Sequence, residues 1–180
     1  VKNQKNLLAF SAGVDSTALF FLLLEQNIPF NIAIVNYNIR NQSKEEVFYA
    51  KELAKKYNKE IFIFDTKIEN NSNFEKQARD IRYSFFEEII NKYLYKTLIT
   101  AHQLNDKLEW FMMQLSKGAG LVELIGFNEF EQKDTYKIYK PLLNITKDEL
   151  ETYLQKNKHK YFVDESNFDE KYKRNFFRHN

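Results

Sequence analysis

The chain has 180 residues, of which 43% are apolar and 16% aromatic, with 27 basic and 25 acidic residues and a net charge of +2. These values predict one domain with a packed core, alone or with a short appendage, and exclude two large domains or a disordered chain. The absence of cysteine excludes disulfides, iron–sulfur clusters, thiolate metal sites and cysteine nucleophiles among these residues. The longest apolar run, from Ala18 to Leu24, is far shorter than the roughly 20 residues of a membrane span. We therefore expect a cytoplasmic protein without membrane contact.

Short apolar runs alternate with longer helical patterns along the chain. Strands are expected at residues 6–10, 30–36, 60–65, 97–100 and 136–139. Helices are expected at residues 18–26, 43–57, 72–93, 105–115 and from 146 onward. Capping boxes are expected to open three of these helices, with Ser43, Ser72 and Thr146 as the capping residues. Because parallel strands need crossover connections, this alternation predicts a doubly wound α/β fold, with a parallel sheet covered by helices on both faces.

The loop from Ser11 to Thr17 joins the first expected strand to the first expected helix. Ligands of open α/β sheets bind beyond the carboxyl ends of the strands, and the backbone amides of a helix N-terminus attract anions. Gly13 permits a close backbone approach or a positive φ, and the hydroxyls of Ser11 and Ser16 can donate to phosphate oxygens. The loop therefore predicts a phosphate cradle, and the alternative is an ordinary turn in which Asp15 caps the helix. It matches neither the Walker pattern nor the glycine-rich dinucleotide pattern.

Ser11-Ala12-Gly13-Val14-Asp15-Ser16 resembles the Ser-Gly-Gly-x-Asp-Ser loop of the N-type ATP pyrophosphatases. Seven further segments resemble, in the same order, segments of the tRNA(Ile)-lysidine synthase family: residues 35–43, 73–83, 101–109, 117–120, 140–143, 164–169 and 174–179. The likeness thus covers nearly the whole chain. The sequence departs from the family pattern at four positions: Ala12 for a glycine, Tyr37 for a histidine, Asn105 for an aspartate and Trp110 for a threonine.

The resemblance implies an adenine nucleotide alpha hydrolase-like fold and an ATP-dependent carbon–nitrogen ligase. In this family, ATP adenylates the C2 carbonyl oxygen of the wobble cytidine in the CAU anticodon of tRNA(Ile), with release of pyrophosphate. Free lysine then displaces AMP and gives lysidine. The implied organisation is a catalytic domain at residues 1–145 and a helical, basic extension at 146–180 that leads to further tRNA-binding domains. The oligomeric state is left open between a monomer and a homodimer.

The resemblance also implies roles for individual residues. The loop residues are implied to bind ATP: Ser11, Ala12, Gly13, Val14, Asp15 and Ser16. Asp15 is implied to bind Mg²⁺ as well. The implied catalytic residues are Asp15, His102, Asp106 and Glu109. Asp106 and Glu109 are three residues apart at the start of a helix, so we expect both on the face toward the crevice. The alternative is that the two carboxylates only stabilise the helix through its dipole, and that His102 is a hydrogen-bonded structural residue.

Basic residues supply the expected contacts to tRNA and phosphate: Arg79, Arg82, Lys117, Arg174 and Arg178. Arg79 and Arg82 are expected on one helix face, and the alternative is that they pair with Glu75 or Glu87. Lys117 opens a Lys-Gly-Ala-Gly turn that borders the active site in the family. The tail also interleaves basic and aromatic residues, which suits an RNA backbone with stacked bases, although a charged helix that caps the core is the alternative.

Two other functions remain open. One keeps the ATP pyrophosphatase chemistry with another acceptor, as in nucleotide amidation or tRNA thiolation. Thiolation is disfavoured because those enzymes generally use cysteines or an iron–sulfur cluster. The other is a non-catalytic module that binds a nucleotide without turnover.

Overall fold

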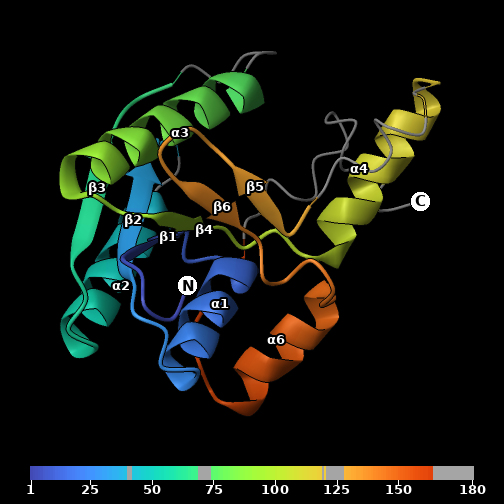
Figure 1. Ribbon diagram of the computed structural model, residues 1–180. Helices are drawn as coiled ribbons and strands as arrows, with labels where there is room; N and C mark the ends of the chain where they lie inside the picture. The colour runs from blue at the N-terminus through green and yellow to red at the C-terminus, as the bar shows by residue number, and fades with distance from the viewer. Residues whose placement is uncertain (40–41, 69–73, 119, 121–127, 164–180) are drawn as a thin grey trace.

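The computed structural model describes residues 1–39, 42–68, 74–118, 120 and 128–163. A six-stranded sheet with the order β3-β2-β1-β4-β6-β5 forms its centre (Figure 1). Its strands are β1 (Asn6–Ala9), β2 (Asn31–Asn36), β3 (Ile61–Asp65), β4 (Thr97–Ile99), β5 (Phe130–Gln132) and β6 (Lys137–Tyr139). Every neighbouring pair is parallel except the edge pair of β5 and β6, which is antiparallel.

The chain path makes this a doubly wound sheet. From β1 the chain moves outward through β2 to β3, and it then crosses back to place β4 on the other side of β1. The strand order therefore reverses between β1 and β4. In open α/β sheets, the crevice outside the carboxyl ends at such a reversal is the usual place for a ligand.

Helices cover both faces of the sheet, as the sequence predicts. They are α1 (Val14–Glu25), α2 (Gln42–Lys56), α3 (Phe74–Tyr93), α4 (Leu104–Ser116) and α6 (Lys147–Lys156). Successive strand residues point to opposite faces, so Leu8 packs in a core with α1, α2 and α6 while Leu7 packs in a second core with α3. None of the described helices is long and apolar enough to cross a membrane.

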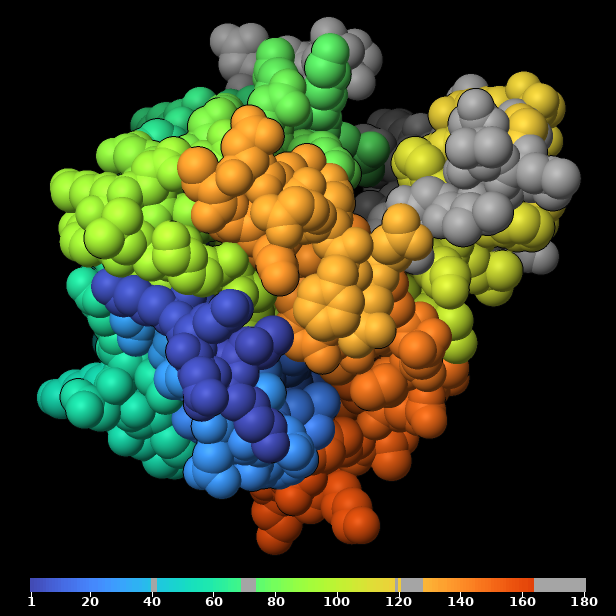
Figure 2. Space-filling model, viewed as in Figure 1, coloured from blue at the N-terminus to red at the C-terminus, as the bar shows by residue number. Residues whose placement is uncertain are grey.

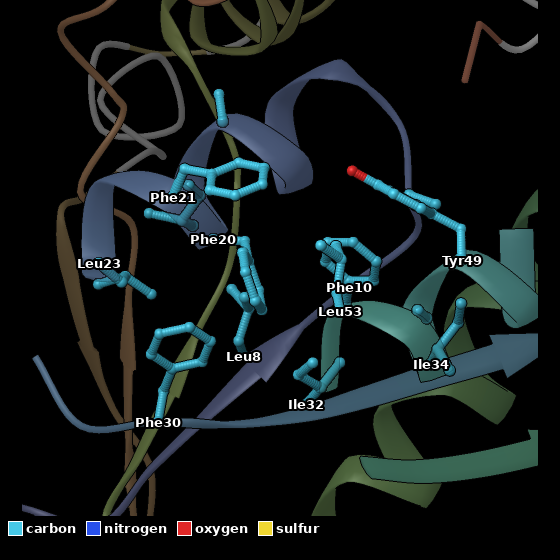
Figure 3. Packing of buried hydrophobic residues seen from close by; sticks show 14 of the residues in the cluster. Leu8, Phe10, Phe20, Phe21, Leu23, Phe30, Ile32, Ile34, Tyr49 and Leu53 are labelled. Atoms are coloured by element: carbon cyan, nitrogen blue, oxygen red, sulfur yellow. The ribbon is translucent and has the colours of Figure 1, made fainter. Parts of the chain in front are cut away.

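The larger core contains a group of aromatic rings. Phe20 of α1 lies edge-on to Phe30 with ring centroids 5.2 Å apart, and it also contacts Phe10 at 5.9 Å. Figure 3 shows these rings together with Leu8 of β1 and Leu53 of α2. The buried rings fix α1 against the sheet, and α1 in turn fixes the loop that precedes it.

Helix α6, the first element of the predicted extension, joins this same core. Its residues Leu150 and Leu154 are 1% and 0% exposed and belong to the cluster that contains Phe20. Burying a leucine side chain stabilises a fold by about 1.5–3 kcal/mol, so α6 is tied firmly to α1.

The elements differ from the predicted ones in three main places. Helix α1 begins at Val14 and not at residue 18, because the loop residues form its first turn. Helix α2 begins at Gln42, so Ser43 lies inside the helix and is not its cap. Strand β5 was not predicted, since three residues carry too little pattern and only pairing with β6 reveals them. Thr146 is confirmed as the cap of α6, whereas Ser72 lies outside the described residues.

Candidate active site

A cavity of about 340 Å³ lies at the carboxyl ends of β1 and β4, where the strand order reverses. The loop after β1 supplies one wall, and the loop after β4, from Thr100 to Gln103, supplies another together with Asp106. Side chains from distant parts of the chain complete the lining: Arg82, Tyr83, Phe86, Lys147, Phe162 and Val163. The sheet topology alone therefore brings together the two loops that the sequence singled out.

Hydrogen bonds of the Ser16 hydroxyl hold the loop after β1 in shape. The Ser16 Oγ accepts from the backbone N–H of Ser11 at 3.2 Å, lies 3.1 Å from the Ser11 Oγ and donates to the Gly13 carbonyl at 3.3 Å. Ser16 is only 4% exposed, while Ser11 is exposed. The geometry thus gives Ser16 a role in the loop itself, in addition to the predicted phosphate contact.

The N-terminus of α1 opens toward the cavity. Gly13 is its N-cap, and no side chain makes a capping hydrogen bond there. This corrects the alternative in which Asp15 caps the helix, since Asp15 is the second residue of α1. Val14, Asp15 and Ser16 all line the cavity, so the positive end of the helix dipole faces this space. Such an arrangement suits an anion.

The positive φ of this loop occurs at Ala12 and not at Gly13. Ala12 has a φ of 62° whereas Gly13 has a φ of −73°, which corrects the prediction for the glycine. A left-handed conformation costs an alanine about 1–2 kcal/mol. The Ala12 methyl group is completely buried in the core, and the Ala12 carbonyl accepts a hydrogen bond of 3.0 Å from the Phe162 N–H. These contacts offset the strain.

Phe162 and Val163 are part of the cavity that the sequence did not indicate. Gly13 and Phe162 form an isolated parallel β-bridge, which lays residues 161–163 beside the loop. This contact joins positions about 150 residues apart, and it follows from the packing of α6 on α1. No local sequence signal could have shown it.

The loop after β4 brings His102 and Asp106 to the cavity. The Nδ1 of His102 lies 2.9 Å from the Thr100 Oγ1, a hydrogen bond that orients the ring. An Oδ2 atom of Asp106 accepts from the Gln103 N–H at 3.0 Å, and Gln103 caps α4 in return. Asp106 therefore completes a capping box while it lines the cavity. The predicted catalytic position and the helix-terminus alternative are both compatible with this geometry.

Glu109 does not share this position. It is only 4% exposed within α4 and is not among the residues that line the cavity. Asp106, in contrast, is half-buried at the cavity wall. The expectation that both acids project into one crevice is therefore wrong for the cavity as the structure has it.

The two predicted arginines of α3 also separate. Arg82 lines the cavity, and its charge opposes the pKa increase that burial causes at Tyr37. Arg79 instead stacks over the ring of Tyr83 at 5.1 Å and does not line the cavity. Glu87, one of the acids considered as their partner, accepts a hydrogen bond from the Tyr136 hydroxyl at 3.0 Å.

Lys117 lies at the far end of α4. It is the C-cap of this helix, eleven residues after Asp106, which corresponds to about 16 Å along the helix axis. Gly118 follows with a φ of 69° and ends the helix, as the sequence predicts. In the space-filling view α4 stands at one side of the molecule, next to α6 (Figure 2). Arg174 and Arg178 lie outside the described residues.

Asn105 and Lys147 form a link that the sequence reasoning missed. The Asn105 Oδ1 accepts a hydrogen bond of 3.1 Å from the backbone N–H of Lys147, the first residue of α6. The Leu104 N–H donates to the Ile145 carbonyl at 3.0 Å nearby. The N-termini of α4 and α6 are thus joined, and the side chain of Lys147 lines the cavity. No sequence signal indicated this link, because the aspartate of the family pattern could accept the same hydrogen bond.

Comparison with known families agrees with this geometry. The family model described as the PP-loop domain matches residues 1–180. The chain belongs to the PP-loop family. The loop from Ser11 to Ser16 is accordingly called the PP loop below.

The chain is also similar to proteins named tRNA(Ile)-lysidine synthase. It is 51% identical to that of Campylobacter jejuni strain RM1221 over 100% of this chain and 56% of the relative. For Helicobacter pylori strain 26695 the identity is 52%, over 100% of this chain and 53% of the relative. For the protein of Thermosipho africanus the identity is 38%, over 99% of this chain and 43% of the relative. The chain spans about half the length of the curated relatives it matches.

Two solved structures share the fold. A U34-tRNA thiolase from Methanococcus maripaludis superposes with a TM-score of 0.74 at 23% identity, over 89% of this chain and 58% of that one. An NH3-dependent NAD synthetase from Campylobacter jejuni gives a TM-score of 0.58 at 17% identity, over 95% of this chain and 69% of that one. At these identities the likeness extends to the fold alone, and it confirms the α/β architecture expected from the sequence.

Proposed function

We propose that this chain carries the catalytic site of a ligase that uses ATP to join lysine to C2 of the wobble cytidine in the CAU anticodon of tRNA(Ile). The observation that carries this proposal is the convergence of the PP loop, His102 and Asp106 on one cavity. The chain in which they converge is 51% identical, over its whole length, to tRNA(Ile)-lysidine synthases. The reaction passes through an adenylated tRNA, releases pyrophosphate and then AMP, and takes place in the cytoplasm.

The ATP phosphates bind at the N-terminus of α1 in this proposal. The helix has no side-chain cap, so its first amides can donate to phosphate oxygens, with the loop residues Ser11, Ala12 and Gly13 around them. Two cationic side chains, Arg82 and Lys147, line the same cavity and offset the phosphate charge. This arrangement favours a triphosphate over a neutral ligand.

The donor set fits Mg²⁺ bound together with the phosphates. Asp15 supplies a half-buried carboxylate at the cavity wall. Within the described ranges, no group of three or more histidine, aspartate or glutamate side chains is arranged to hold a metal ion by itself. Mg²⁺ typically uses one or two carboxylates and completes its shell with water and phosphate oxygens. When bound, the ion would neutralise charge on the departing pyrophosphate.

Asp106 and His102 act on the second substrate. The amine of lysine has a reference pKa of about 10.4, so it arrives as an ammonium and must lose a proton before it attacks. The Asp106 carboxylate can bind this ammonium, and Asp106 or His102 can take the proton as the amine displaces AMP from C2. We assign Glu109, which is buried in α4 and does not line the cavity, a positioning role in this helix and not the proton transfer.

The remaining basic residues bind the tRNA. The sequence resemblance implies that Arg174 and Arg178 contact the tRNA, and both follow Phe162 and Val163, which line the cavity, in the sequence. We assign these two arginines, together with Arg79 and Lys117, to the phosphate backbone of the tRNA. Arg79 and Lys117 are exposed and therefore accessible to a large partner.

Another acceptor is the main competing function. The fold likeness to a thiolase does not favour thiolation, because these 180 residues contain no cysteine to hold a cluster or carry sulfur. A nucleotide-binding module without turnover would not need Asp106 and His102 beside the phosphate site.

Pyrophosphate release from ATP tests the proposal when it is measured with CAU-anticodon tRNA(Ile), with and without lysine, on this chain and on the full-length protein. Mass analysis of the anticodon nucleoside then identifies the product, and we expect lysidine. Pyrophosphate release without lysidine would assign another acceptor. Nucleotide binding without any release from either protein would favour the binding module.

A further inference from the structure

A second hollow, of about 550 Å³, lies on the helical face formed by α1, α2 and the segment after α6. Four aromatic side chains and three lysines dominate its lining: Phe21, Tyr49, Tyr57, His159, Lys56, Lys158 and Lys160. Glu52 is the acidic side chain of this lining, so the hollow carries a net positive charge. Phe21 and Tyr49 belong to the larger core and Tyr57 packs against it, but neither this core nor the PP-loop chemistry accounts for the three lysines.

The ring of His159, which is half-buried, covers the buried ring of Phe21. The rings of Phe21 and His159 stack at 3.5 Å with an angle of 2° between their planes. Tyr57 lies edge-on to Phe21 at 5.9 Å. Burial lowers the pKa of His159 from its ordinary value, which keeps the ring neutral at pH 7 even though Glu25 acts in the opposite direction. A neutral ring of this kind can stack with a nucleobase.

The ammonium groups of Lys160 and Lys56 lie over aromatic rings. The Lys160 Nζ lies 4.8 Å from the ring centroid of Phe162 and 5.8 Å from that of Tyr49. The Lys56 Nζ lies 5.3 Å from the ring centroid of Tyr57. Lys56 ends α2, where its charge also favours the helix dipole, but Lys158 and Lys160 lie beyond the end of α6 and gain nothing there.

The segment from Asn157 to Val163 is fixed by hydrogen bonds at several points. The His159 N–H donates to the Leu154 carbonyl at 2.9 Å, and the Tyr49 hydroxyl donates to the Lys160 carbonyl. Further along, the Phe162 N–H donates to the Ala12 carbonyl of the PP loop. A binding surface fixed before its ligand arrives loses less conformational entropy on binding.

This segment connects the two cavities. Asn157 to Lys160 line the second hollow, and Phe162 and Val163 line the PP-loop cavity. Lys160 and Phe162 are two residues apart, a separation of about 7 Å in extended chain. One strand of nucleic acid can therefore reach both places.

We propose that this hollow binds the RNA backbone next to the nucleotide that enters the PP-loop cavity, with the lysines on phosphates and the ring of His159 under an unstacked base. The proposal rests on the proposed function in taking RNA as the substrate. Cations beside aromatic rings are the usual features of a surface for single-stranded RNA.

Fluorescence anisotropy with labelled tRNA(Ile), recorded over a range of salt concentrations, tests this site. The variant combines Lys158→Asn and Lys160→Gln. Asparagine removes the charge and tolerates the positive φ of 54° at position 158, while glutamine keeps most of the side-chain stem. We expect affinity for tRNA to fall about tenfold or more, and the slope of log affinity against log salt to shrink by about 1.5–2. ATP binding stays unchanged.

Lys92→Gln is the matched control. The Lys92 Nζ also lies over the ring of its neighbour, Tyr93, at 5.4 Å, but on α3 at the opposite face of the sheet. If the double variant binds tRNA like this control, the inference is wrong, whereas lysidine formation by the wild-type protein would leave the proposed function intact. If the double variant loses affinity for polyglutamate but not for tRNA, the hollow binds an acidic protein and the inference is also wrong.

Photocrosslinking locates the RNA independently of affinity. A tRNA(Ile) with 4-thiouridine beside the anticodon should crosslink to the peptide that contains residues 157–163. Crosslinks confined to other peptides would overturn the assignment.

Discussion

Helices α1 and α4 both begin at the candidate active site, yet their N-termini are built differently. The N-cap of α1 is Gly13, which offers no side chain to the first amides. The N-terminus of α4 has a full capping box, in which Gln103 accepts from the Asn105 N–H at 2.6 Å and Asp106 accepts from the Gln103 N–H. Helix α6, which begins nearby, is capped in the same way by Thr146 and Glu149.

This difference distinguishes the helix end at which we propose that the ligand binds from two helix ends that the protein caps itself. Backbone amides at a helix start need acceptors, and a capping side chain supplies them within the protein. A helix end without such a side chain keeps its amides available for an external anion. The comparison therefore predicts that changes at α1 affect ligand binding and turnover, while changes at the capped helices affect stability as well.

The largest expected effect concerns Asp106, which lines the cavity and also belongs to the capping box of α4. Asp106→Ala and Asp106→Asn should each lower the rate of lysidine formation at least about 100-fold, since both remove the carboxylate charge at the cavity. Asparagine can still accept from the Gln103 N–H, so only Asp106→Ala should also lower the free energy of unfolding, by about 1 kcal/mol. Single-turnover assays and urea unfolding measure the two effects. A near wild-type rate for Asp106→Asn would remove Asp106 from the chemistry.

Asp15 tests the uncapped helix. Asp15→Ala should lower the rate about as much as the changes at Asp106, because the carboxylate faces the phosphate site. The free energy of unfolding should fall by less than for Asp106→Ala, since Asp15 lies in the first turn of α1 and does not cap it. A variant that is strongly destabilised but fully active when folded would reverse the comparison.

Asn105 tests the link between the two capped helices. Asn105→Ala removes the acceptor for the Lys147 N–H and should lower the free energy of unfolding by about 1 kcal/mol. It should also raise the KM for ATP more than it lowers kcat, because Lys147 loses its fixed place at the cavity. Asn105→Asp keeps the acceptor and should restore both values. Equal behaviour of the two variants would show that this hydrogen bond does not position Lys147.

The cap of α6 makes a pH-dependent contribution to stability. The hydroxyl and the backbone N–H of Thr146 lower the pKa of Glu149 from its ordinary value of 4.5. A lowered pKa means that this stabilisation is present at neutral pH and is lost as the pH falls through the folded-state pKa, below 4.5. Thr146→Ala should raise the Glu149 pKa in an NMR titration and lower the free energy of unfolding by about 1 kcal/mol at pH 7. Thr146→Ser keeps the hydroxyl and should leave the pKa as it is.

The smallest expected effect is at Ala12. Ala12→Gly relieves the positive φ but removes a buried methyl group worth about 0.8 kcal/mol, so the net change in the free energy of unfolding should stay below about 1 kcal/mol. Gly118→Ala is the matched control, because it also places an alanine at a positive φ, here 69°. Its methyl group would meet no atom within 4 Å, so no packing would offset the strain. It should lower the free energy of unfolding by about 1–2 kcal/mol. A larger loss at Ala12 would mean that the PP loop depends on this methyl group.

Much of the fold and part of the site were predictable because their signals are local. Alternating apolar runs indicated the five parallel strands and the helices between them, and the Thr146 box marked the start of α6. The loop at Ser11 could be placed at the carboxyl end of a strand for the same reason. Strand β5 and the positive φ at Ala12 could not be predicted, since each depends on pairing or packing with distant residues.

The sequence by itself determined the doubly wound fold, the PP loop and the presence of acids after the fourth strand, because periodicity and motif spacing depend only on residues that are close together in the sequence. Only the tertiary structure decided which of these side chains share a cavity. It brought His102, Asp106 and Arg82 to the PP loop, left Glu109, Arg79 and Lys117 outside the lining, and added Lys147 and Phe162. The physical reason is that the packing of α6 on α1 and the reversal of strand order between β1 and β4 join segments that are far apart in the chain.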